Sequence, residues 1–325
     1  MRLLVTGGCG FIGSNFIKLL LGRYKDARIT NLDKLTYCGN PDNLKDVAAD
    51  SRYTFVQGDI CDEKLVDDMV RDADAVVNFA AETHVDRSIK YPDDFIRTNV
   101  LGVKTLLEAS RRAKVSRFLQ IGTDEVYGSV EEGLSKETDP LFPRSPYSAT
   151  KAAGDLLALS YHKTYGLPVV VVRSSNNFGP YQYPEKVVPL FITNLLESRK
   201  VPLYGDGGNI RDWLYVEDNC SAIDLVLHKG DVGQIYNIGG GNLLSNLELT
   251  DKILAAMGKS RDMIEYVNDR PGHDRRYALD STKVKQLGWS PGKSFEENLK
   301  RTIEWYENNR KWWKTLKQKA EIIEW

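Results

Sequence analysis

A short apolar strand that runs directly into a glycine-rich turn is the feature that most constrains this chain. Residues 3–6 form the strand-like run, and Gly8, Gly10 and Gly13 follow in G-x-G-x-x-G spacing at the start of an amphipathic stretch, 11–21. Glycines at this spacing allow a tight turn, close approach of the backbone to a pyrophosphate, and close packing of helix on strand. The free N–H groups and dipole of the helix N-terminus favour a bound anion. The segment therefore predicts a dinucleotide-binding β-α-β unit.

An acidic residue after the second predicted strand indicates which dinucleotide is bound. Asp33 follows the run 29–32 and lies twenty residues beyond Gly13, where a carboxylate accepts hydrogen bonds from a ribose 2′-hydroxyl. The same carboxylate repels a 2′-phosphate, so the sequence predicts NAD rather than NADP. A glycine-rich turn without a ligand is the alternative, and Asp33 argues against it.

Short runs rich in Val, Ile and Leu alternate with longer amphipathic stretches in the first half of the chain. The predicted strands are 3–6, 29–32, 54–57, 75–79, 118–121 and 169–172, and the predicted helices are 11–21, 63–71, 94–113 and 146–165. This order predicts an α/β fold with a Rossmann-type, doubly wound parallel sheet over residues 1–178. After about Gly179 Pro and Gly punctuate shorter elements. Residues 179–325 are therefore expected to form mainly a smaller C-terminal substrate-binding lobe, part of which can return to the first domain.

Composition excludes several classes of protein. The chain carries 44 Lys and Arg against 45 Asp and Glu, a formal net charge of −1, so no overall field attracts a nucleic acid. The longest aliphatic run, 167–172, is far shorter than a bilayer span, and no signal-like segment precedes the first strand. The four scattered cysteines form no C-x-x-C pair, which indicates reduced thiols and no zinc site. We expect a cytoplasmic protein that binds no metal, membrane or nucleic acid.

Two residues in the predicted helix 146–165 are candidate catalytic groups. Tyr147 and Lys151 are four residues apart, which places them on one helix face. A lysine cation beside the phenol, helped by the nicotinamide charge, favours the phenolate, so Tyr147 can act as a base while Lys151 also holds the nicotinamide ribose. On an isolated helix such a pair would more often be a surface contact. A catalytic role for this pair is favoured here because a predicted dinucleotide-binding fold precedes it in the chain.

A second motif, residues 121–128, follows the fifth predicted strand at the edge where parallel sheets bind ligands. It contains Thr123 and the adjacent carboxylates Asp124 and Glu125. Neighbouring carboxylates push their pKa values apart, so one can serve as an acid and the other as a base. Solvated loop acids are the alternative for a bare Asp-Glu pair.

Together, the glycine loop, the Thr-Asp-Glu segment and Y-x-x-x-K resemble the nucleotide-sugar 4,6-dehydratases of the extended short-chain dehydrogenase/reductase superfamily, and most closely the bacterial members that act on dTDP-glucose. The resemblance covers essentially the whole chain and includes 35–37, 80–88, 175–180, 184–186, 211–218 and 269–277. Related 4-epimerases share the glycine loop and Y-x-x-x-K but typically lack the Asp-Glu pair. Cys9 and Cys38, where small residues such as Ala are common, are mild departures.

The resemblance implies a lyase that converts dTDP-glucose to dTDP-4-keto-6-deoxyglucose. NAD+ would oxidise C4 of the sugar, water would be lost across C5 and C6, and hydride would return to C6. Tyr147 would take the proton of the 4-hydroxyl that Thr123 binds, with Lys151 beside it. Glu125 would remove the C5 proton, and Asp124 would protonate the departing 6-hydroxyl. A UDP-glucose 4,6-dehydratase, a nucleotide-sugar 4-epimerase and a non-catalytic NAD-binding protein remain alternatives.

The resemblance also implies two sets of binding residues. The NAD set is Gly7, Gly10, Phe11, Ile12, Gly13, Asp33, Lys34, Leu35, Thr36, Asp59, Ile60, Phe79, Ala80, Ala81, Thr98, Tyr147, Lys151 and Asn177. The sugar-nucleotide set is Thr83, Thr123, Asn176, Lys186, Val187, Pro202, Tyr204, Arg211, Asn246, Arg270, His273 and Tyr277, with Arg276 as a further diphosphate candidate. Asp59 is explained equally well as a helix cap, and His84 and Asp86 are expected to be structural.

Two further expectations concern helices. The helices 94–113 and 146–165 are expected to pair with their copies in a homodimer, as the superfamily resemblance implies. In the segment 295–325, which holds Trp305, Trp312, Trp313 and Trp325, the residues Leu299, Ile303 and Tyr306 form a stripe at helical spacing. That stripe predicts packing on the second lobe rather than a membrane or partner surface.

Overall fold

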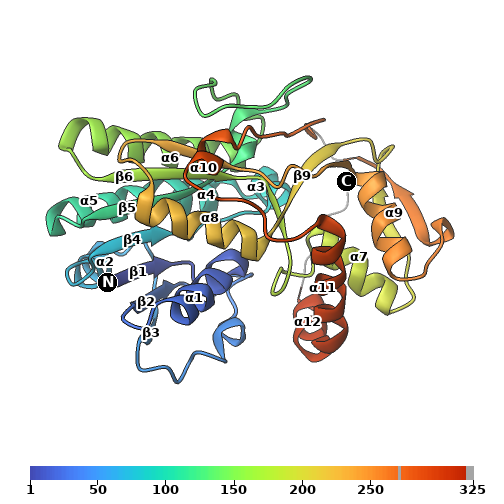
Figure 1. Cartoon of the computed structure of the whole chain (residues 1–325), viewed down its shortest axis with the longest axis horizontal. Helices are drawn as coiled ribbons and strands as arrows, with labels where there is room; N and C mark the ends of the chain where they lie inside the picture. The colour runs from blue at the N-terminus through green and yellow to red at the C-terminus, as the bar shows by residue number, and fades with distance from the viewer. Residues whose placement is uncertain (270–271, 320–325) are drawn as a thin grey trace.

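The computed structural model describes residues 1–269 and 272–319 and has a central parallel sheet of seven strands (Figure 1). The strand order is β10-β6-β5-β4-β1-β2-β3. The strands are β1 (Arg2–Thr6), β2 (Arg28–Asp33), β3 (Tyr53–Gln57), β4 (Ala75–Asn78), β5 (Arg117–Thr123), β6 (Val169–Ser174) and β10 (Ile235–Ile238). Every residue of the Val-rich strand β6 is buried, as expected for a parallel strand covered on both faces. The predicted Rossmann-type sheet is confirmed.

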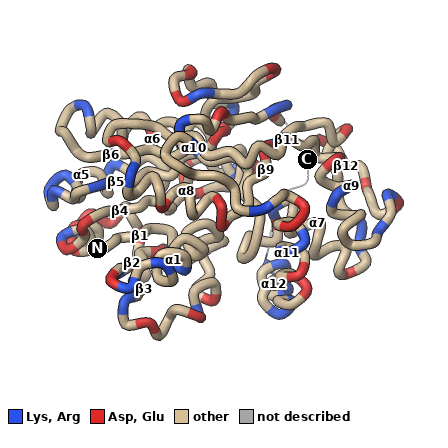
Figure 2. The backbone as a smooth tube through the Cα atoms, in the orientation of Figure 1, with Lys and Arg blue, Asp and Glu red and all other residues tan. Residues whose placement is uncertain are grey.

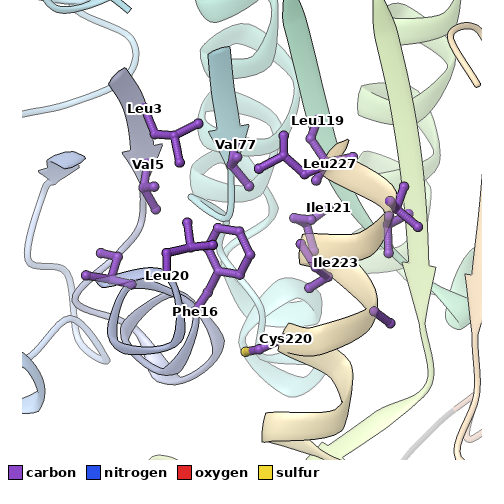
Figure 3. Close-up of a cluster of buried hydrophobic side chains, with 14 of the residues drawn as sticks. Leu3, Val5, Phe16, Leu20, Val77, Leu119, Ile121, Cys220, Ile223 and Leu227 are labelled. Carbon is purple, nitrogen blue, oxygen red and sulfur yellow. The ribbon is translucent and has the colours of Figure 1, made fainter. Parts of the chain in front are cut away.

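Helices cover both faces of this sheet because its strands alternate their side chains between two apolar clusters. One cluster joins Leu3 and Val5 of β1 to α1 (Phe11–Arg23) and α8 (Val216–Lys229). Figure 3 shows Phe16 and Leu20 of α1 directed towards the same core as side chains of α8. On the other face, the cluster that contains Leu4 includes residues of α2 (Glu63–Val70), α5 (Val103–Ala113) and α6 (Pro146–Tyr165).

The seventh strand comes from the second half of the chain. β10 pairs in parallel with β6, with Ile235 opposite Val171 and Ile238 opposite Ser174. The helix before it, α8, packs on α1. Part of the chain beyond residue 178 therefore returns to the sheet. Such a return was expected from the sequence, but the strand itself was not, because a four-residue run carries little periodic signal.

The second lobe is built around its own apolar cluster. Its strands are β7 (Asn176–Phe178), β8 (Val201–Tyr204), β9 (Ile210–Tyr215), β11 (Leu243–Ser245) and β12 (Ile264–Val267), which form the small sheets β11-β9-β7 and β12-β8. Its helices are α7 (Val187–Leu196), α9 (Asn246–Ala256), α11 (Phe295–Asn308) and α12 (Arg310–Lys317). The remaining short helical elements are η1 (Pro41–Leu44), α3 (Val85–Lys90), η3 (Asp124–Tyr127), η4 (Arg261–Met263) and α10 (Thr282–Gln286).

Two of the predicted helices are interrupted. The stretch 94–113 is divided into α4 (Pro92–Ile96), a π-helical segment η2 (Arg97–Gly102) and α5. The C-terminal stretch ends one helix at Asn308 and begins the next at Arg310. Leu299, Ile303 and Tyr306 are buried in the second lobe, so the predicted packing of that stripe is confirmed. Trp325 lies outside the described residues.

The surface carries charges of both signs. Figure 2 shows Lys and Arg interspersed with Asp and Glu along the backbone of both lobes, in keeping with the net charge of −1. Among the helices that the structure describes, none has the length and apolar character that a membrane crossing requires. Cys9, Cys38, Cys61 and Cys220 are free thiols.

Candidate active site

One large cavity lies at the carboxyl ends of the central strands and extends to the second lobe. It is lined by Thr123, Asp124, Glu125, Tyr147 and Lys151, the five predicted catalytic residues. Every member of the predicted NAD set except Leu35 also lines it. The fold therefore brings segments that follow β1, β2, β3, β4, β5 and β6, and the start of helix α6, to a single site, where open α/β sheets bind their ligands.

The glycine loop forms the floor of this cavity. Gly7 has a φ of +69°, and a Cβ there would lie 2.6 Å from the amide nitrogen of Ala80, so a side chain is excluded by both conformation and space. At Gly13 a Cβ would lie 2.5 Å from the carbonyl oxygen of Gly7, which shows how tightly α1 packs on the turn. The N-cap, Gly10, has no side chain that could satisfy the first-turn amides. The positive end of α1 thus opens on the cavity and suits the pyrophosphate of a dinucleotide.

Asp33 is buried at the end of β2 with its carboxylate fixed by the backbone. Its Oδ2 accepts the N–H of Cys9 at 2.8 Å, and its Oδ1 accepts the N–H of Leu35 at 2.8 Å. Burial raises the pKa of Asp33, although these two hydrogen bonds act in the opposite direction. Leu35 thus contributes a backbone contact to Asp33 and does not line the cavity.

Asp59 is not a helix cap. The cap of α2 is Asp62, whose side chain accepts the N–H of Leu65. Asp59 instead accepts the N–H of Cys61 at 2.9 Å and lies 3.0 Å from the ammonium of Lys34. Burial acts to raise the pKa of Asp59, but these contacts outweigh it and the pKa is lowered. Of the two interpretations of Asp59, the capping role is wrong.

Tyr147 and Lys151 lie in the first two turns of α6, which begins with a capping box formed by Ser145 and Ser148. Both side chains are buried, and the Lys151 Nζ donates to the carbonyl oxygen of Ile121 at 2.5 Å. The pKa of Tyr147 is raised, because burial and then the charge of Glu125 disfavour the phenolate. The expectation that Lys151 favours the phenolate together with the nicotinamide charge stays a prediction. Burial also lowers the pKa of Lys151.

The two carboxylates follow β5 on the short helical turn η3. The hydroxyl of Thr123 donates to Oδ1 of Asp124 at 3.2 Å and accepts the N–H of Glu125 at 3.3 Å. Asp124 is 3 % exposed, and its Oδ2 has no hydrogen-bond partner among the described residues. Burial, and then the charge of Glu125, raise the pKa of Asp124 to about 8. Asp124 therefore carries a proton at neutral pH, which agrees with the predicted division between a protonated and an ionised carboxyl.

Three of the predicted sugar-nucleotide residues, besides Thr123, line the same cavity: Thr83, Asn176 and Lys186. The Oδ1 of Asn176 is buried with no hydrogen-bond partner in the described part of the chain. Arg211 and Tyr277 lie just beyond, with the guanidinium 4.3 Å from the ring centre. The charge of Arg211 acts on Asp124, and that of Glu125 acts on Tyr277.

The other members of that set are farther from the catalytic groups. Val187, Pro202, Tyr204, Asn246 and His273 are not among the residues that line the cavity. They belong to α7, β8, α9 and the segment before Tyr277, and His273 Nδ1 lies 2.6 Å from Asp269. Arg276 bonds the carbonyl oxygens of Val130 and Gly133. Arg270 lies outside the described residues. These assignments stay predictions.

Several cavity and supporting residues were missed by the sequence analysis. Glu82 and Glu185 both line the cavity. Burial and then Asp94 raise the pKa of Glu82 to about 7. Glu185 lies 3.5 Å from Arg87 and 3.7 Å from His84. Its position between Pro184 and Lys186, in a segment that matches the family, was the available signal. The ring of His84 accepts the N–H of Arg87 at the start of α3, in keeping with the expected structural role, which stays a prediction.

A buried ion pair between Asp155 and Arg173 lies near Lys151, and the charge of Asp155 acts on the Lys151 ammonium. Asp155, one turn after Lys151 on α6, accepts a hydrogen bond of 2.9 Å from Nε of Arg173, and both residues are at most 1 % exposed. Arg173 also donates to the hydroxyl of Tyr127, which donates to Asn237. The i, i+4 spacing from Lys151 to Asp155 was the signal in the sequence that Asp155 lies near Lys151.

Within residues 1–269 and 272–319, no group of three His, Cys, Asp or Glu side chains is arranged to hold a metal ion.

Comparisons with known proteins agree with this geometry. Residues 4–302 match the model of the GDP-mannose 4,6 dehydratase family. A dTDP-glucose 4,6-dehydratase of Streptomyces niveus is 54% identical over 99% of this chain and 97% of its own length. The low-salt glycan biosynthesis protein Agl12 of Haloferax volcanii is 56% identical over 94% of this chain and 98% of its own.

A solved structure is also closely similar. The crystal structure of DesIV, a dTDP-glucose 4,6-dehydratase from Streptomyces venezuelae with NAD and TYD bound, superposes with a TM-score of 0.95 at 51% identity, and the match covers 97% of this chain and 100% of that chain. The resemblance inferred from the glycine loop, the Thr-Asp-Glu segment and Y-x-x-x-K is confirmed. The chain belongs to the GDP-mannose 4,6 dehydratase family.

Proposed function

We propose that this protein is an NAD-dependent dTDP-glucose 4,6-dehydratase. The observation that carries the proposal is the meeting, in one cavity, of Tyr147 and Lys151 with Thr123, Asp124 and Glu125, beside the glycine loop. The first pair suits oxidation of a sugar hydroxyl, and the carboxylates suit loss of water. The relatives named dTDP-glucose 4,6-dehydratase, and the neighbour solved with NAD bound, support both the reaction and the cofactor.

The residues would divide the reaction among them. NAD+, when bound, would accept the hydride from C4 and, as NADH, return it to C6. Thr123 binds the 4-hydroxyl and Tyr147 takes its proton, while Lys151 holds the nicotinamide ribose. The resulting 4-ketone makes the C5 proton acidic, and Glu125 removes that proton. Asp124, protonated at neutral pH, gives its proton to the 6-hydroxyl, which leaves as water. Each positioned acid or base contributes about two to four orders of magnitude in rate.

The two halves of the chain would have separate tasks. We propose that residues 1–178 hold NAD, and that most of 179–325 holds the sugar nucleotide. Thr83, Asn176, Lys186, Arg211 and Tyr277 are the best supported substrate contacts, because they line or border the catalytic cavity. We also propose that the protein works in the cytoplasm, since free thiols such as its four cysteines persist in reducing compartments.

A panel of sugar nucleotides tests the proposed reaction directly. The protein would be incubated separately with dTDP-glucose, UDP-glucose and GDP-mannose, and the products identified by mass and by proton NMR, which distinguishes C4 epimers. We expect dTDP-glucose to lose one water and give the 4-keto-6-deoxy sugar fastest. A product of unchanged mass but inverted C4 would identify a 4-epimerase instead. Retention of NAD with no conversion of any sugar would identify a binding protein.

Asp33 is expected to set the preference for NAD. Replacement of Asp33 by Ala removes the carboxylate that would bond the ribose 2′-hydroxyls and repel a 2′-phosphate, so NAD should bind about tenfold or more weakly while NADP improves. Calorimetric titration with both dinucleotides measures this ratio. Asp59→Asn is the matched control. It removes another negative charge from the same cavity wall and should affect both dinucleotides alike. Native protein that bound NADP as tightly as NAD would contradict the prediction.

We further propose a homodimer formed by the helices of residues 92–113 and by α6. Leu101 and Leu156 are each 55% exposed, and Ile96 is 47% exposed, so these helices present apolar side chains that a second copy can cover. Leu156→Glu should weaken the dimer by roughly two orders of magnitude, because it buries a charge on both sides of the interface. Sedimentation at micromolar concentration measures the change. Tyr266→Glu, at an exposed position of β12 in the second lobe, should leave the dimer intact. A native monomer would refute the proposal.

A further inference from the structure

The C-terminal helices contact the cofactor-binding half of the chain. In Figure 1, α11 and α12 lie at the lower edge of the second lobe, on the side that faces α1. From α12, the indole N–H of Trp312 donates to Oδ1 of Asn43 at 3.0 Å. Asn43 belongs to the turn η1, which follows β2. This hydrogen bond therefore joins residues that are 269 positions apart in the sequence.

Asn43 connects that contact to the glycine loop. It is 1% exposed, and its Nδ2 donates to the carbonyl oxygen of Cys9 at 2.9 Å. The N–H of Asn40 donates to the same oxygen at 3.0 Å. On the other side of the residue, the N–H of Cys9 is held by Asp33. Cys9 lies between Gly8 and Gly10, so the backbone that would approach the pyrophosphate is fixed by Asp33 and by Asn43, and Asn43 is itself oriented by Trp312.

The same helices also support a wall of the cavity at Tyr181. This residue lines the cavity in a left-handed conformation, with φ of +69°, which is strained for an aromatic residue. Its ring centre lies 4.7 Å from that of Trp305 and 5.9 Å from that of Trp312. Lys18 of α1 donates to its hydroxyl at 2.6 Å. Tyr181 is thus held between the helix of the glycine loop and the C-terminal helices.

The next two residues of this wall are attached to the C-terminal helices as well. The Tyr306 hydroxyl donates to the carbonyl oxygen of Gln182 at 2.6 Å, and the Tyr183 hydroxyl donates to that of Leu316 at 3.4 Å. Both Gln182 and Tyr183 line the cavity. Two independent parts of the cofactor cavity, the glycine loop and the wall 181–183, therefore depend on α11 and α12.

We propose that α12 is a strap on the cofactor site, and that Trp312 is a positioning residue that slows release of NAD. The inference rests on the proposed function, because a dehydratase that regenerates NAD+ in each turnover needs the cofactor to stay while the sugar nucleotide leaves. The match to the family model ends at residue 302, before Trp312.

The test is the rate at which NAD leaves the holoenzyme, measured by exchange against excess labelled NAD+. Trp312→Phe keeps an aromatic ring near Tyr181 but loses the hydrogen bond to Asn43, and release should become about three to ten times faster. Trp313→Phe is the matched control on the same helix, because the indole N–H of Trp313 donates to the backbone carbonyl of Tyr306. This change leaves in place both the contact of Trp312 with Asn43 and the bond from the Tyr306 hydroxyl to Gln182. It should lower thermal stability without changing release. Thermal unfolding of each variant verifies that release is measured on folded protein.

A double-mutant cycle tests whether Asn43 carries the effect. Asn43→Ala should itself accelerate release, and Trp312→Phe added to Asn43→Ala should accelerate it no further, since both changes break one chain of contacts. The proposal would be overturned if Trp312→Phe released NAD at the native rate, or if Trp312→Phe and Trp313→Phe changed the release rate equally. Additive effects of Asn43→Ala and Trp312→Phe in the cycle would also overturn it. The exchange assay contains no sugar nucleotide. A protein that retained NAD through Trp312 but converted no sugar would refute the dehydratase and leave the strap intact.

Discussion

Replacement of Tyr147 by Phe is expected to abolish the first chemical step, the oxidation of the sugar at C4. The phenol is the group that takes the 4-hydroxyl proton as hydride departs, and Phe preserves the ring while removing that group. Tyr147 is buried, and neither its ring packing on Phe95 nor the capping box of α6 requires the hydroxyl. We expect the single-turnover rate of cofactor reduction to fall by about two to four orders of magnitude.

The measurement is rapid-mixing absorbance of the cofactor after addition of dTDP-glucose. Tyr161→Phe is the matched control, because Tyr161 lies on the same helix and its hydroxyl donates to Glu108, a residue that does not line the cavity. It should reduce the cofactor at close to the native rate. If Tyr147→Phe did so as well, Tyr147 would not be the base.

The raised pKa of Tyr147 means that burial disfavours the phenolate that the first step requires. We expect the charge of the bound nicotinamide, together with that of Lys151, to favour the phenolate against this burial.

Features that depend on local spacing could be predicted from the sequence. The glycine loop, the end of β2 at Asp33 and the pair Tyr147 and Lys151 are each defined within one β-α unit or one helix, where periodicity and backbone sterics act over a few residues. The sheet followed from the same alternation. The distinction between oxidation and dehydration came from Asp124 and Glu125, and it needed the family resemblance, since two adjacent acids have no meaning by spacing alone.

Features that depend on tertiary contact could not be predicted in this way. β10 is a strand because β6 offers it an edge, and Glu185 reaches the cavity because the second lobe folds over the first. The role of Asp59 was decided by a neighbour, since Asp62 caps α2 and leaves Asp59 to Lys34. The pKa of Tyr147 depends on burial, which spacing does not reveal. The contact between Trp312 and Asn43 is the hardest of these to predict, because the two residues are 269 positions apart in the sequence.

Replacement of Glu125 by Gln is expected to separate the oxidation from the loss of water. The hydroxyl of Thr123 and the phenol of Tyr147 remain, so hydride should still pass from C4 to NAD+. Gln cannot take the C5 proton, and the variant should stall with reduced cofactor and a 4-keto hexose that keeps its 6-hydroxyl. Release of the 4-keto-6-deoxy product should fall by about two to four orders of magnitude. Absorbance of the bound cofactor and mass analysis of the sugar follow the two steps separately. Glu82→Gln, an acid on the same cavity wall outside the proposed chemistry, is the control and should not stall at this point.

Asp124, the acid in this step, determines how the rate of water loss should change with pH. Asp124 delivers a proton only while it is protonated, and burial with Glu125 beside it places its pKa at about 8. Loss of water should therefore be independent of pH from neutrality to about 8, as long as Glu125 is ionised, and fall about tenfold per unit above 8. Asp124→Asn should abolish that dependence along with most of the rate, because an amide has no proton to give. Native release of product by both Glu125→Gln and Asp124→Asn would show that the carboxylates are only loop acids. Other groups would then carry out the loss of water, and the roles assigned here to Asp124 and Glu125 would be wrong.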